Sequence, residues 1–256
     1  MLRIDLNCDM GESTPLWHHS VEQDSAILPF VSSVNLACGF HAGDPYVMHS
    51  MVEAALRAGV AIGAHPSFAD RENFGRTNHQ LSPEQLYDTV LYQLGALQAF
   101  LQVNGASLHH VKPHGAMYNM AAKDPVMAKA ICTAVYDFDD DLILYGLAGS
   151  TLIETGNHSW LKTCSEVFAD RSYQDDGSLT PRQSPGAMIG SREAAVAQVL
   201  QMVKEKTVTT LSGKTIPVTA ETICIHGDGP DAIAYAAAIH QALQMAGIDI
   251  SFPVKK

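Results

Sequence analysis

Short apolar, β-branched runs alternate with helical stretches along this chain, and that alternation is the strongest constraint on its fold. The runs predict strands near Arg3 to Cys8, Ser33 to Cys38, Val60 to His65, Leu108 to Lys112, Leu142 to Gly146, Cys164 to Ala169, Gly186 to Ile189 and Thr222 to His226. Seven or eight β-then-α units in 256 residues predict an α/β fold, a (β/α) barrel of the TIM type. An open, doubly wound sheet is the alternative.

One segment interrupts the alternation near the C-terminal end. Two β-branched runs, Thr207 to Leu211 and Thr215 to Val218, flank the turn sequence Ser212-Gly213-Lys214. This pattern predicts a β-hairpin inserted near residues 207–219. Because no linker or low-complexity segment divides the chain, residues 1–256 are expected to form a single barrel domain.

Helix start signals follow several of the predicted strands. Ser82-Pro83-Glu84-Gln85 supplies an N-cap hydroxyl, a proline at the first helical position and a glutamine three residues after the cap. Asp124-Pro125 and Asp228-Gly229-Pro230 predict two further helix starts of a similar kind.

Polar side chains share one face of several predicted strands. The first strand places Asp5, Asn7 and Asp9 on one face and apolar residues on the other, because successive side chains alternate. The second strand repeats this pattern with Ser33 and Asn35. Strands of a parallel barrel are usually apolar on both faces, so we expect the apolar set to pack on helices and the polar set to point into the barrel.

Polar residues also gather directly after the strands, in the βα loops where barrel enzymes place their active sites. These loops contain Asp9 and Glu12, His41 and Asp44, His65, Lys112 and His114, Asp170 and Arg171, and His226 and Asp228. Glycine accompanies them in most of the loops. Their convergence on one rim predicts a functional site there.

Two chemistries fit these side chains. Imidazole and carboxylate groups suit zinc or manganese, so one option is a divalent metal that activates water. Its candidate ligands are Asp9, His41, His65, His114 and His226. The other option is metal-free acid and base work by Asp9, Glu12 and Asp228, with Lys112 and Arg171 neutralising an anionic substrate.

The charge balance and the cysteines restrict partners and compartment. With 16 Lys and Arg against 27 Asp and Glu, the net charge of −11 disfavours a nucleic-acid partner. The longest apolar run, Ala232 to Ile239, is far shorter than the ~20 residues that cross a bilayer, so no membrane partner is expected. Five cysteines without a CxxC motif, and no signal-peptide pattern at the N-terminus, predict a cytoplasmic protein.

Two nucleotide-binding patterns are matched only in part. Ser212-Gly213-Lys214-Thr215 lacks the first P-loop glycine, which would fall at Val208, and it lies between two strands. Gly227 to Ala232 fits G-x-G-x-x-A, but only 24 residues follow it, too few for the remaining strands of a dinucleotide fold. We therefore expect a hairpin turn at the first and no nicotinamide site at the second.

Six stretches of the sequence resemble the LamB/YcsF family of 5-oxoprolinase A subunits. They are IDLNCDMGE (Ile4 to Glu12), SVNLACGFHAGD (Ser33 to Asp44), IGAHPS (Ile62 to Ser67), VKPHGAMY (Val111 to Tyr118), EVFADR (Glu166 to Arg171) with Tyr173, and HGD (His226 to Asp228). They run from the first predicted strand to the start of the last helix, so the resemblance covers essentially the whole chain.

The resemblance implies a barrel similar to those of the glycoside hydrolase and deacetylase superfamily. It also implies an ATP-dependent cleavage of 5-oxoproline (pyroglutamate) to L-glutamate, with ADP and phosphate formed and with partner subunits B and C. Two other readings stay open, a stand-alone metal-dependent deacetylase or amidase and a non-catalytic subunit that binds the substrate.

Roles for individual residues follow as hypotheses. We expect Asp9 or Glu12 to act as general base and Lys112 and Arg171 to bind the substrate carboxylate or a phosphorylated oxygen. Further expected roles are substrate binding by Asn7 and Asn35, proton donation or polar stabilisation by His114 and His226, orientation of His226 or water by Asp228, and metal binding by His41 and His65.

Overall fold

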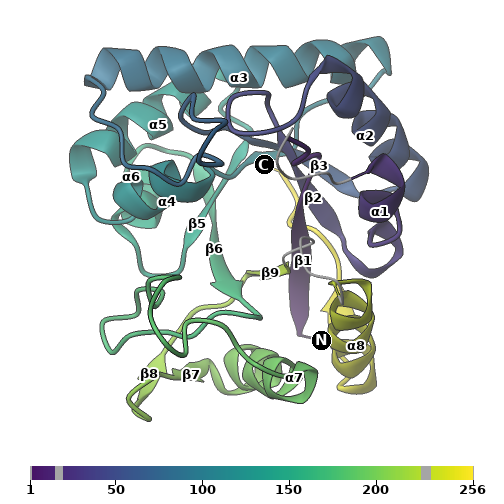
Figure 1. Cartoon of the computed structure of the whole chain (residues 1–256), viewed down its shortest axis with the longest axis vertical. Helices are drawn as coiled ribbons and strands as arrows, with labels where there is room; N and C mark the ends of the chain where they lie inside the picture. The colour runs from purple at the N-terminus through teal and green to yellow at the C-terminus, as the bar shows by residue number, and fades with distance from the viewer. Residues whose placement is uncertain (1, 15–19, 226–231, 256) are drawn as a thin grey trace.

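Seven parallel strands close into a barrel in the computed structural model, which describes residues 2–14, 20–225 and 232–255. They are β1 (Arg3–Met10), β2 (Ser33–Ala37), β3 (Ala61–His65), β4 (His110–Val111), β5 (Ile143–Leu147), β6 (Lys162–Phe168) and β9 (Thr222–Ile225). Neighbours pair in that order, and β9 pairs with β1 to complete the ring (Figure 1). The predicted barrel is therefore confirmed, and the open sheet is wrong for this chain.

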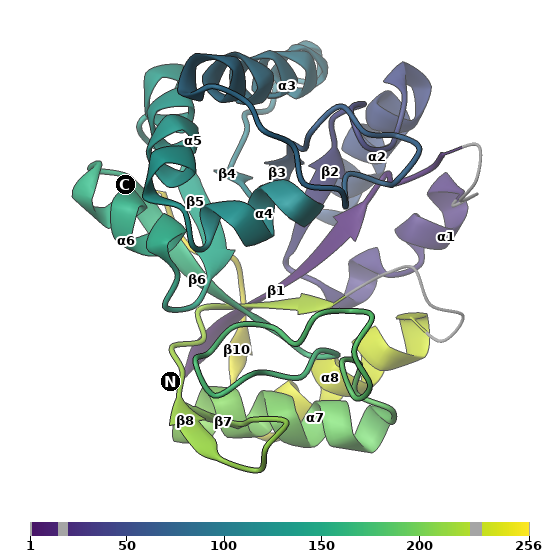
Figure 2. The ribbon, with the colours of Figure 1, turned by 60° about the vertical axis from the view of Figure 1, so that its left-hand side comes forward.

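Helices surround the barrel on its outer side, as Figure 2 shows. They are α1 (Val21–Ser25), α2 (Pro45–Ala58), α3 (Pro83–Val103), α4 (Gly115–Ala121), α5 (Pro125–Phe138), α6 (Thr151–His158), α7 (Arg192–Leu200) and α8 (Ala232–Met245), with a 3-10 turn at Leu28–Phe30 and a π turn at Gln201–Glu205. Ser82 and Gln85 form the predicted capping box at α3, and Asp124 caps α5. The predicted start at Asp228 lies outside the described residues.

The two faces of the strands separate as predicted. Leu6, Val34 and Ile223 are fully buried in the hydrophobic core that the strands share with the helices. Asp5, Asn7, Ser33 and Asn35 are buried as well, but they bond to one another or to other polar groups inside the barrel. The parallel register aligns these polar positions, because Asn7 lies opposite Ser33 and Asp5 opposite Thr222.

One predicted strand, Gly186 to Ile189, is wrong. Met188 forms only an isolated antiparallel bridge with Arg171, inside a long excursion between β6 and α7. The run is short and apolar between Pro185 and Gly190, and periodicity alone cannot distinguish such a run from a strand. The excursion folds back over the end of β6 and does not join the barrel.

Two smaller elements complete the sheets. β7 (Thr207–Thr209) and β8 (Thr215–Pro217) pair antiparallel, which is the hairpin expected there. β10 (Asp249–Ile250), which the sequence did not predict, pairs with β1 at Arg3 and Ile4. Within the described ranges, no helix combines the length and the apolar character needed to span a bilayer.

Candidate active site

Four side chains bring atoms that could bind a metal ion to within 4.8 Å of one another at the carboxyl end of the barrel: Asp9, Glu12, His65 and His114. We call them the four-donor cluster. Asp9 lies near the end of β1 and Glu12 just beyond it, while His65 ends β3 and His114 is the N-cap of α4. The cluster lines a cavity of about 590 Å³, at the end of the barrel where TIM-type enzymes bind substrates.

Contacts inside the cluster join carboxylate oxygens to imidazole nitrogens. His65 Nε2 lies 3.3 Å from Asp9 Oδ2, and His114 Nδ1 lies 3.2 Å from Glu12 Oε1. The two inner nitrogens are themselves only 3.0 Å apart. Four electron-rich atoms therefore face a common point.

The outer nitrogens fix the orientation of both rings. His65 Nδ1 donates to the carbonyl oxygen of Lys112 at 2.6 Å, and His114 Nε2 donates to that of Phe74 at 2.9 Å. In a neutral imidazole the other nitrogen then carries a lone pair, so both inner nitrogens present lone pairs beside two carboxylates. Such a set needs a positive charge among its atoms. The arrangement of outer N–H groups on backbone carbonyls is the one that metal-binding histidines adopt.

His41 supports the cluster from the side. Its Nε2 lies 3.1 Å from Glu12 Oε1, and its ring stacks on that of His114 with centroids 3.8 Å apart. Burial and the neighbouring His114 lower the pKa of His41 to about 3, so this ring is neutral. Of the two histidines predicted to bind a metal, His65 belongs to the four-donor cluster and His41 contacts it through Glu12.

The same rings determine the charge of Glu12. Burial raises the pKa of this carboxyl group, but its contacts with His114 and His41 outweigh burial and hold the pKa well below its usual range. Glu12 is therefore ionised, and the cluster carries a negative charge that a cation would balance.

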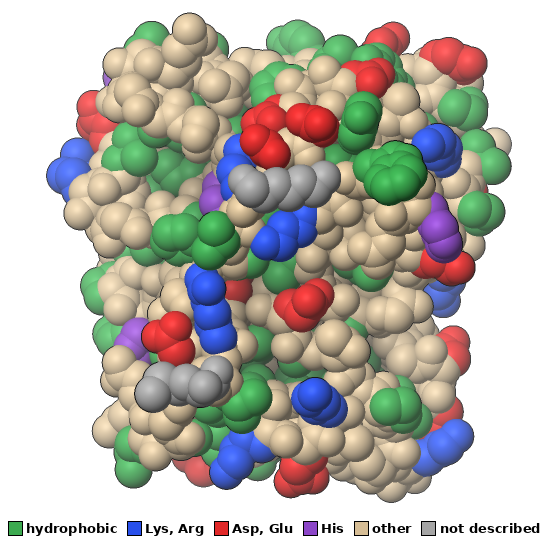
Figure 3. Space-filling view, turned by 180° about the vertical axis from the view of Figure 1, so that it is seen from behind, with side chains coloured by type: hydrophobic (Ala, Val, Ile, Leu, Met, Phe, Trp, Pro, Cys, Tyr) green, Lys and Arg blue, Asp and Glu red, His purple; other side chains and the backbone are tan. Residues whose placement is uncertain are grey.

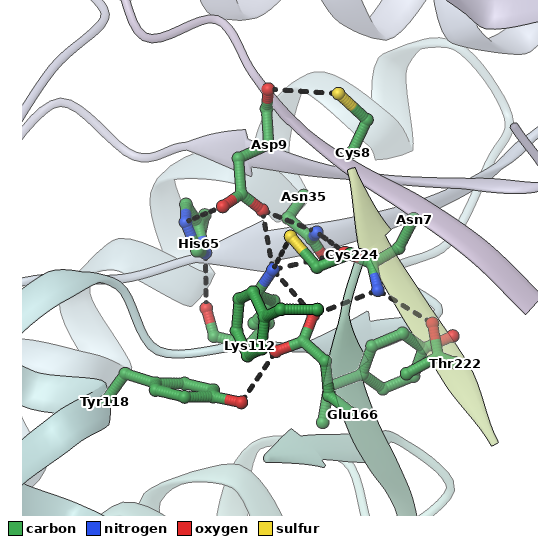
Figure 4. A network of polar contacts seen from close by, with 12 residues as sticks. Asn7, Cys8, Asp9, Asn35, His65, Lys112, Tyr118, Glu166, Thr222 and Cys224 are labelled. Atoms are coloured by element: carbon green, nitrogen blue, oxygen red, sulfur yellow. Dashed lines mark hydrogen bonds and ion pairs between the residues drawn. The ribbon is translucent and has the colours of Figure 1, made fainter. Parts of the chain in front are cut away.

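Lys112 lies beneath the cluster, inside the barrel (Figure 4). Its Nζ is 2.9 Å from Asp9 Oδ1 and 2.7 Å from Glu166 Oε1, and it also contacts Cys224 Sγ at 3.2 Å. Burial lowers the pKa of Lys112, but Asp9, Cys224 and Glu166 reverse the effect and raise it well above its usual value. The structure therefore places a charged lysine between two carboxylates, where it holds Asp9 in position.

Asn7 and Asn35 lie in the same network. Asn35 Nδ2 donates to Asn7 Oδ1 and to Asp9 Oδ1, both at 2.8 Å. Asn7 Nδ2 donates to Glu166 Oε1 at 3.0 Å and to Thr222 Oγ1 at 2.7 Å. Both amides are fully buried, and their N–H groups bind residues of the barrel.

Glu166 was not assigned a role from the sequence. It is fully buried in β6, where it binds Lys112 and Asn7 and accepts a hydrogen bond from the Tyr118 hydroxyl at 2.7 Å. A charged residue in the middle of a predicted barrel strand was the available signal, because buried carboxylates are almost always paired.

A glycine in the loop after β3 allows the imidazoles to lie so close together. Gly75 has a φ of +64°, and a Cβ atom there would lie 2.3 Å from Ser67 Oγ, 2.9 Å from His41 Cβ and 3.0 Å from His114 Cδ2. These separations are shorter than van der Waals contact, so only glycine fits without displacing a ring.

The remaining predicted site residues are placed differently. Arg171 lines the same cavity but does not belong to the four-donor cluster. It is 6% exposed, and its Nη2 donates to the carbonyl oxygen of Thr180 at 2.6 Å. His226 and Asp228 lie outside the described residues, so their roles stay predictions.

Comparison with known proteins places this chain among a large set of relatives. The model of the LamB/YcsF family matches residues 4–256. The A subunit of 5-oxoprolinase from Tolumonas auensis is 55% identical over 250 residues, which cover 98% of this chain and 99% of that protein. The protein of the same description from Bacillus subtilis is 51% identical over 251 residues, 98% of this chain and 97% of the relative.

A solved structure agrees with these matches. The lactam utilization protein from Thermus thermophilus superposes with a TM-score of 0.90 and 44% sequence identity, and the match covers 98% of this chain and 99% of that one. The family model and the relatives both extend over nearly the whole length, so this chain belongs to the LamB/YcsF family.

Proposed function

We propose that this chain is the A subunit of a 5-oxoprolinase, a hydrolase that opens the cyclic amide of 5-oxoproline to give L-glutamate. The four-donor cluster carries the proposal, because it places two carboxylates and two oriented imidazoles in one large cavity. Relatives described as the A subunit of 5-oxoprolinase and as a lactam utilization protein support the substrate class.

We propose further that ring opening is coupled to ATP, with ADP and phosphate as products. An unstrained amide is a poor electrophile, and a phosphoryl group on the ring carbonyl oxygen makes the carbonyl carbon easier for water to attack. Over the whole reaction one water oxygen enters the new side-chain carboxylate, the C–N bond breaks, and the ring nitrogen takes protons to become the amino group of glutamate. The phosphoanhydride bond of ATP breaks when the phosphoryl group moves to the ring carbonyl oxygen and ADP leaves. Ring opening then produces an acyl phosphate, from which a second water releases phosphate.

Within this scheme the chain's own residues orient water and move protons. Glu12 or Asp9 accepts a proton from the attacking water, since both are acceptors at the edge of the cavity. Of the two predicted roles of His114, polar stabilisation suits its geometry better, because its Nε2–H group is bound to the Phe74 carbonyl. Lys112, Glu166, Asn7 and Asn35 hold Asp9 in place from below. His226 and Asp228 keep their predicted roles as stabiliser and orienting group.

The donor set fits a divalent metal ion. Asp9, Glu12, His65 and His114 would hold it, because their inner atoms are electron-rich and both rings are oriented by backbone carbonyls. When bound, such an ion polarises a carbonyl oxygen and lowers the pKa of a water molecule.

Partner subunits B and C belong to the same proposal. The sequence offers no complete P-loop, so unfamiliar loops of this chain or a partner subunit would complete the ATP site. All five cysteines are buried and unpaired, which suits a reducing cytoplasm.

The direct test is glutamate release from 5-oxoproline by the purified chain, with and without subunits B and C and with and without ATP. We expect glutamate only when all three subunits and ATP are present. Glutamate formed by the chain alone, without ATP, would overturn the coupled reaction.

A stand-alone metal-dependent amidase or deacetylase is the second candidate, and the four-donor cluster is the observation that favours it. Elemental analysis of the purified chain, combined with an ATP-free assay on simple amides and acetylated sugars, would detect it. The coupled reaction predicts no turnover in that assay, whatever the metal content.

A non-catalytic, substrate-capturing subunit is a third reading, and Asp9→Asn separates it from the proposal. The variant keeps the shape of the side chain but removes its charge. We expect turnover by the reconstituted complex to fall at least about 100-fold if Asp9 takes part in the chemistry. Nearly unchanged turnover would favour the capturing role.

A further inference from the structure

Basic side chains gather along the outer wall of the active-site cavity. Arg76, Lys123, Arg171 and Arg182 all line it, and the last two come from the excursion between β6 and α7. The whole sequence holds only 16 Lys and Arg against 27 Asp and Glu. On the back of the molecule, by contrast, basic and acidic side chains lie interspersed (Figure 3). We call Lys123, Arg171 and Arg182 the cationic wall.

Arg171 is the buried member of this wall. Only 6% of the residue is exposed; its Nη2 bonds to Thr180, but its Nε–H group has no hydrogen-bond partner. An unsatisfied buried donor on a guanidinium group is costly, and native proteins rarely retain one without a reason. The guanidinium group of Arg171 is therefore held in the cavity wall with part of its hydrogen-bonding capacity unused.

Repulsion between neighbouring cations points the same way. Burial and the charge of Arg182 lower the pKa of Arg171 to about 10, although Asp170 acts in the opposite direction. Because like charges repel, an anion that enters the cavity beside both guanidinium groups is attracted by each of them. Lys112 does not contribute to this wall, because Asp9 and Glu166 already bind its ammonium group.

The size of the cavity distinguishes between possible anions. Its volume of about 590 Å³ is in the range that encloses drug-sized ligands, and a five-membered ring with one carboxylate fills only part of it. Three cations are also more than a single carboxylate requires. A phosphoryl group, with up to two negative charges and three acceptor oxygens, matches both the charge and the space.

We propose that the cationic wall is a phosphoryl-binding subsite, in which Arg171 and Arg182, assisted by Lys123, bind phosphoryl oxygens while the four-donor cluster faces the lactam ring. The inference rests on the proposed function, because ATP-coupled ring opening brings a phosphoryl group to this cavity. Two sources share this chemistry, the terminal phosphates of a nucleotide and a phosphorylated carbonyl oxygen.

Isothermal titration of the full-length chain with inorganic pyrophosphate tests the subsite. A chelator is included so that a metal at the four-donor cluster cannot recruit the probe. We expect saturable binding that weakens about tenfold or more in Arg171→Gln and in Arg182→Gln, since each removes charged hydrogen bonds. Lys129→Gln, which changes an exposed lysine on α5, is the matched control and should bind as the wild type does.

Two further ligands identify the source of the phosphoryl group. Tight binding of ATP with weak binding of acetyl phosphate assigns the subsite to the nucleotide, and the reverse assigns it to the phosphorylated carbonyl. Arg182 is exposed, so Arg182→Gln is expected to fold, and Arg171→Lys retains the charge if Arg171→Gln does not fold.

The subsite is overturned if pyrophosphate does not bind, or if it binds both glutamine variants as tightly as the wild type. If the variants bind 5-oxoproline more weakly but pyrophosphate unchanged, the cationic wall binds the substrate carboxylate. That result would also overturn the phosphoryl subsite. Glutamate release by the reconstituted complex is measured in parallel. Turnover without pyrophosphate binding rejects only the subsite, whereas arginine-dependent pyrophosphate binding without turnover rejects only the proposed function.

Discussion

Two carboxylates of β1, Asp5 and Asp9, point into the same barrel but have different surroundings. Asp5 accepts hydrogen bonds from four hydroxyl groups, those of Ser32 at 2.6 Å, Ser33 at 2.8 Å, Thr222 at 2.6 Å and Tyr145 at 3.0 Å. Asp9 lies four residues further along the strand, where it contacts Lys112 through Oδ1 and the lone pair of His65 through Oδ2.

The difference separates a structural carboxylate from a functional one. Every identified partner of Asp5 is a hydrogen-bond donor. The hydroxyl groups of the protein therefore satisfy this carboxylate at the amino-terminal end of the barrel interior, which we call the closed end. Asp9 Oδ1 also accepts hydrogen bonds, but Asp9 Oδ2 faces the lone pair of His65, and the four-donor cluster lines a cavity. Asp5 is 1% exposed and the Asp9 side chain 9%, so the kind of neighbouring group separates the two carboxylates more clearly than burial does.

The largest effect on stability is expected from Lys112→Met, which removes the buried positive charge between Asp9 and Glu166. It leaves Asp9 and Glu166 buried without their shared cation, and such losses cost about 3–5 kcal/mol. Urea unfolding followed by circular dichroism measures the change. Lys129→Met, at an exposed site, should cost less than about 0.5 kcal/mol. A loss below about 1 kcal/mol for Lys112→Met would contradict the buried charge pair, and adding Glu166→Leu should restore part of the stability.

The next largest effect is expected when one metal-ligand side chain is removed from the four-donor cluster. Glu12→Gln takes a charged ligand from the four-donor cluster, and we expect the affinity for zinc or manganese to fall about 100-fold. Competition with a chromophoric chelator measures this affinity directly. Tyr145→Phe, which removes a hydroxyl from the closed end, is the matched control and should bind metal normally. Equal affinities in the wild type and Glu12→Gln would rule out a metal site at these four residues.

The smallest effect concerns the closed end and its dependence on pH. Burial raises the pKa of Asp5 above its ordinary value of 3.8, although its hydroxyl partners oppose the rise. When folding raises the pKa of a carboxyl group, the folded state binds its proton more tightly than the unfolded state does. The protein therefore loses stability as the pH increases through the folded-state pKa. We therefore expect the wild type to lose stability relative to Asp5→Asn as the pH rises above 3.8. Parallel curves in urea titrations would show that folding does not shift this pKa.

Most of the fold follows from local sequence patterns. The alternation of strands and helices, the capping box at Ser82 and the inward polar face of β1 all depend on neighbouring residues, so the sequence predicts them. The run from Gly186 to Ile189 was misjudged because its fate depends on Arg171 and the excursion around it. β10 was missed because two residues are too few to show a period.

The site could be predicted as a group but not as a set of contacts. Asp9, Glu12, His65 and His114 were identified because polar residues at strand ends of a parallel barrel must converge. The partners of Lys112 could not be read from the sequence, since Asp9 is 103 residues away along the chain. Glu166 lies within a strand and not at its end, so the strand-end argument passed over it.

Gly75 has a consequence for how this site can change. A Cβ atom at this position would collide with Ser67 Oγ, with the Cβ atom of His41 and with the ring of His114, so the distance between the imidazoles depends on the path of the backbone after β3. Repacking of side chains cannot alter that distance by small steps. Substitutions along the outer wall of the cavity can therefore change which ligand is accepted, while the spacing of the donors stays constant unless the whole loop moves.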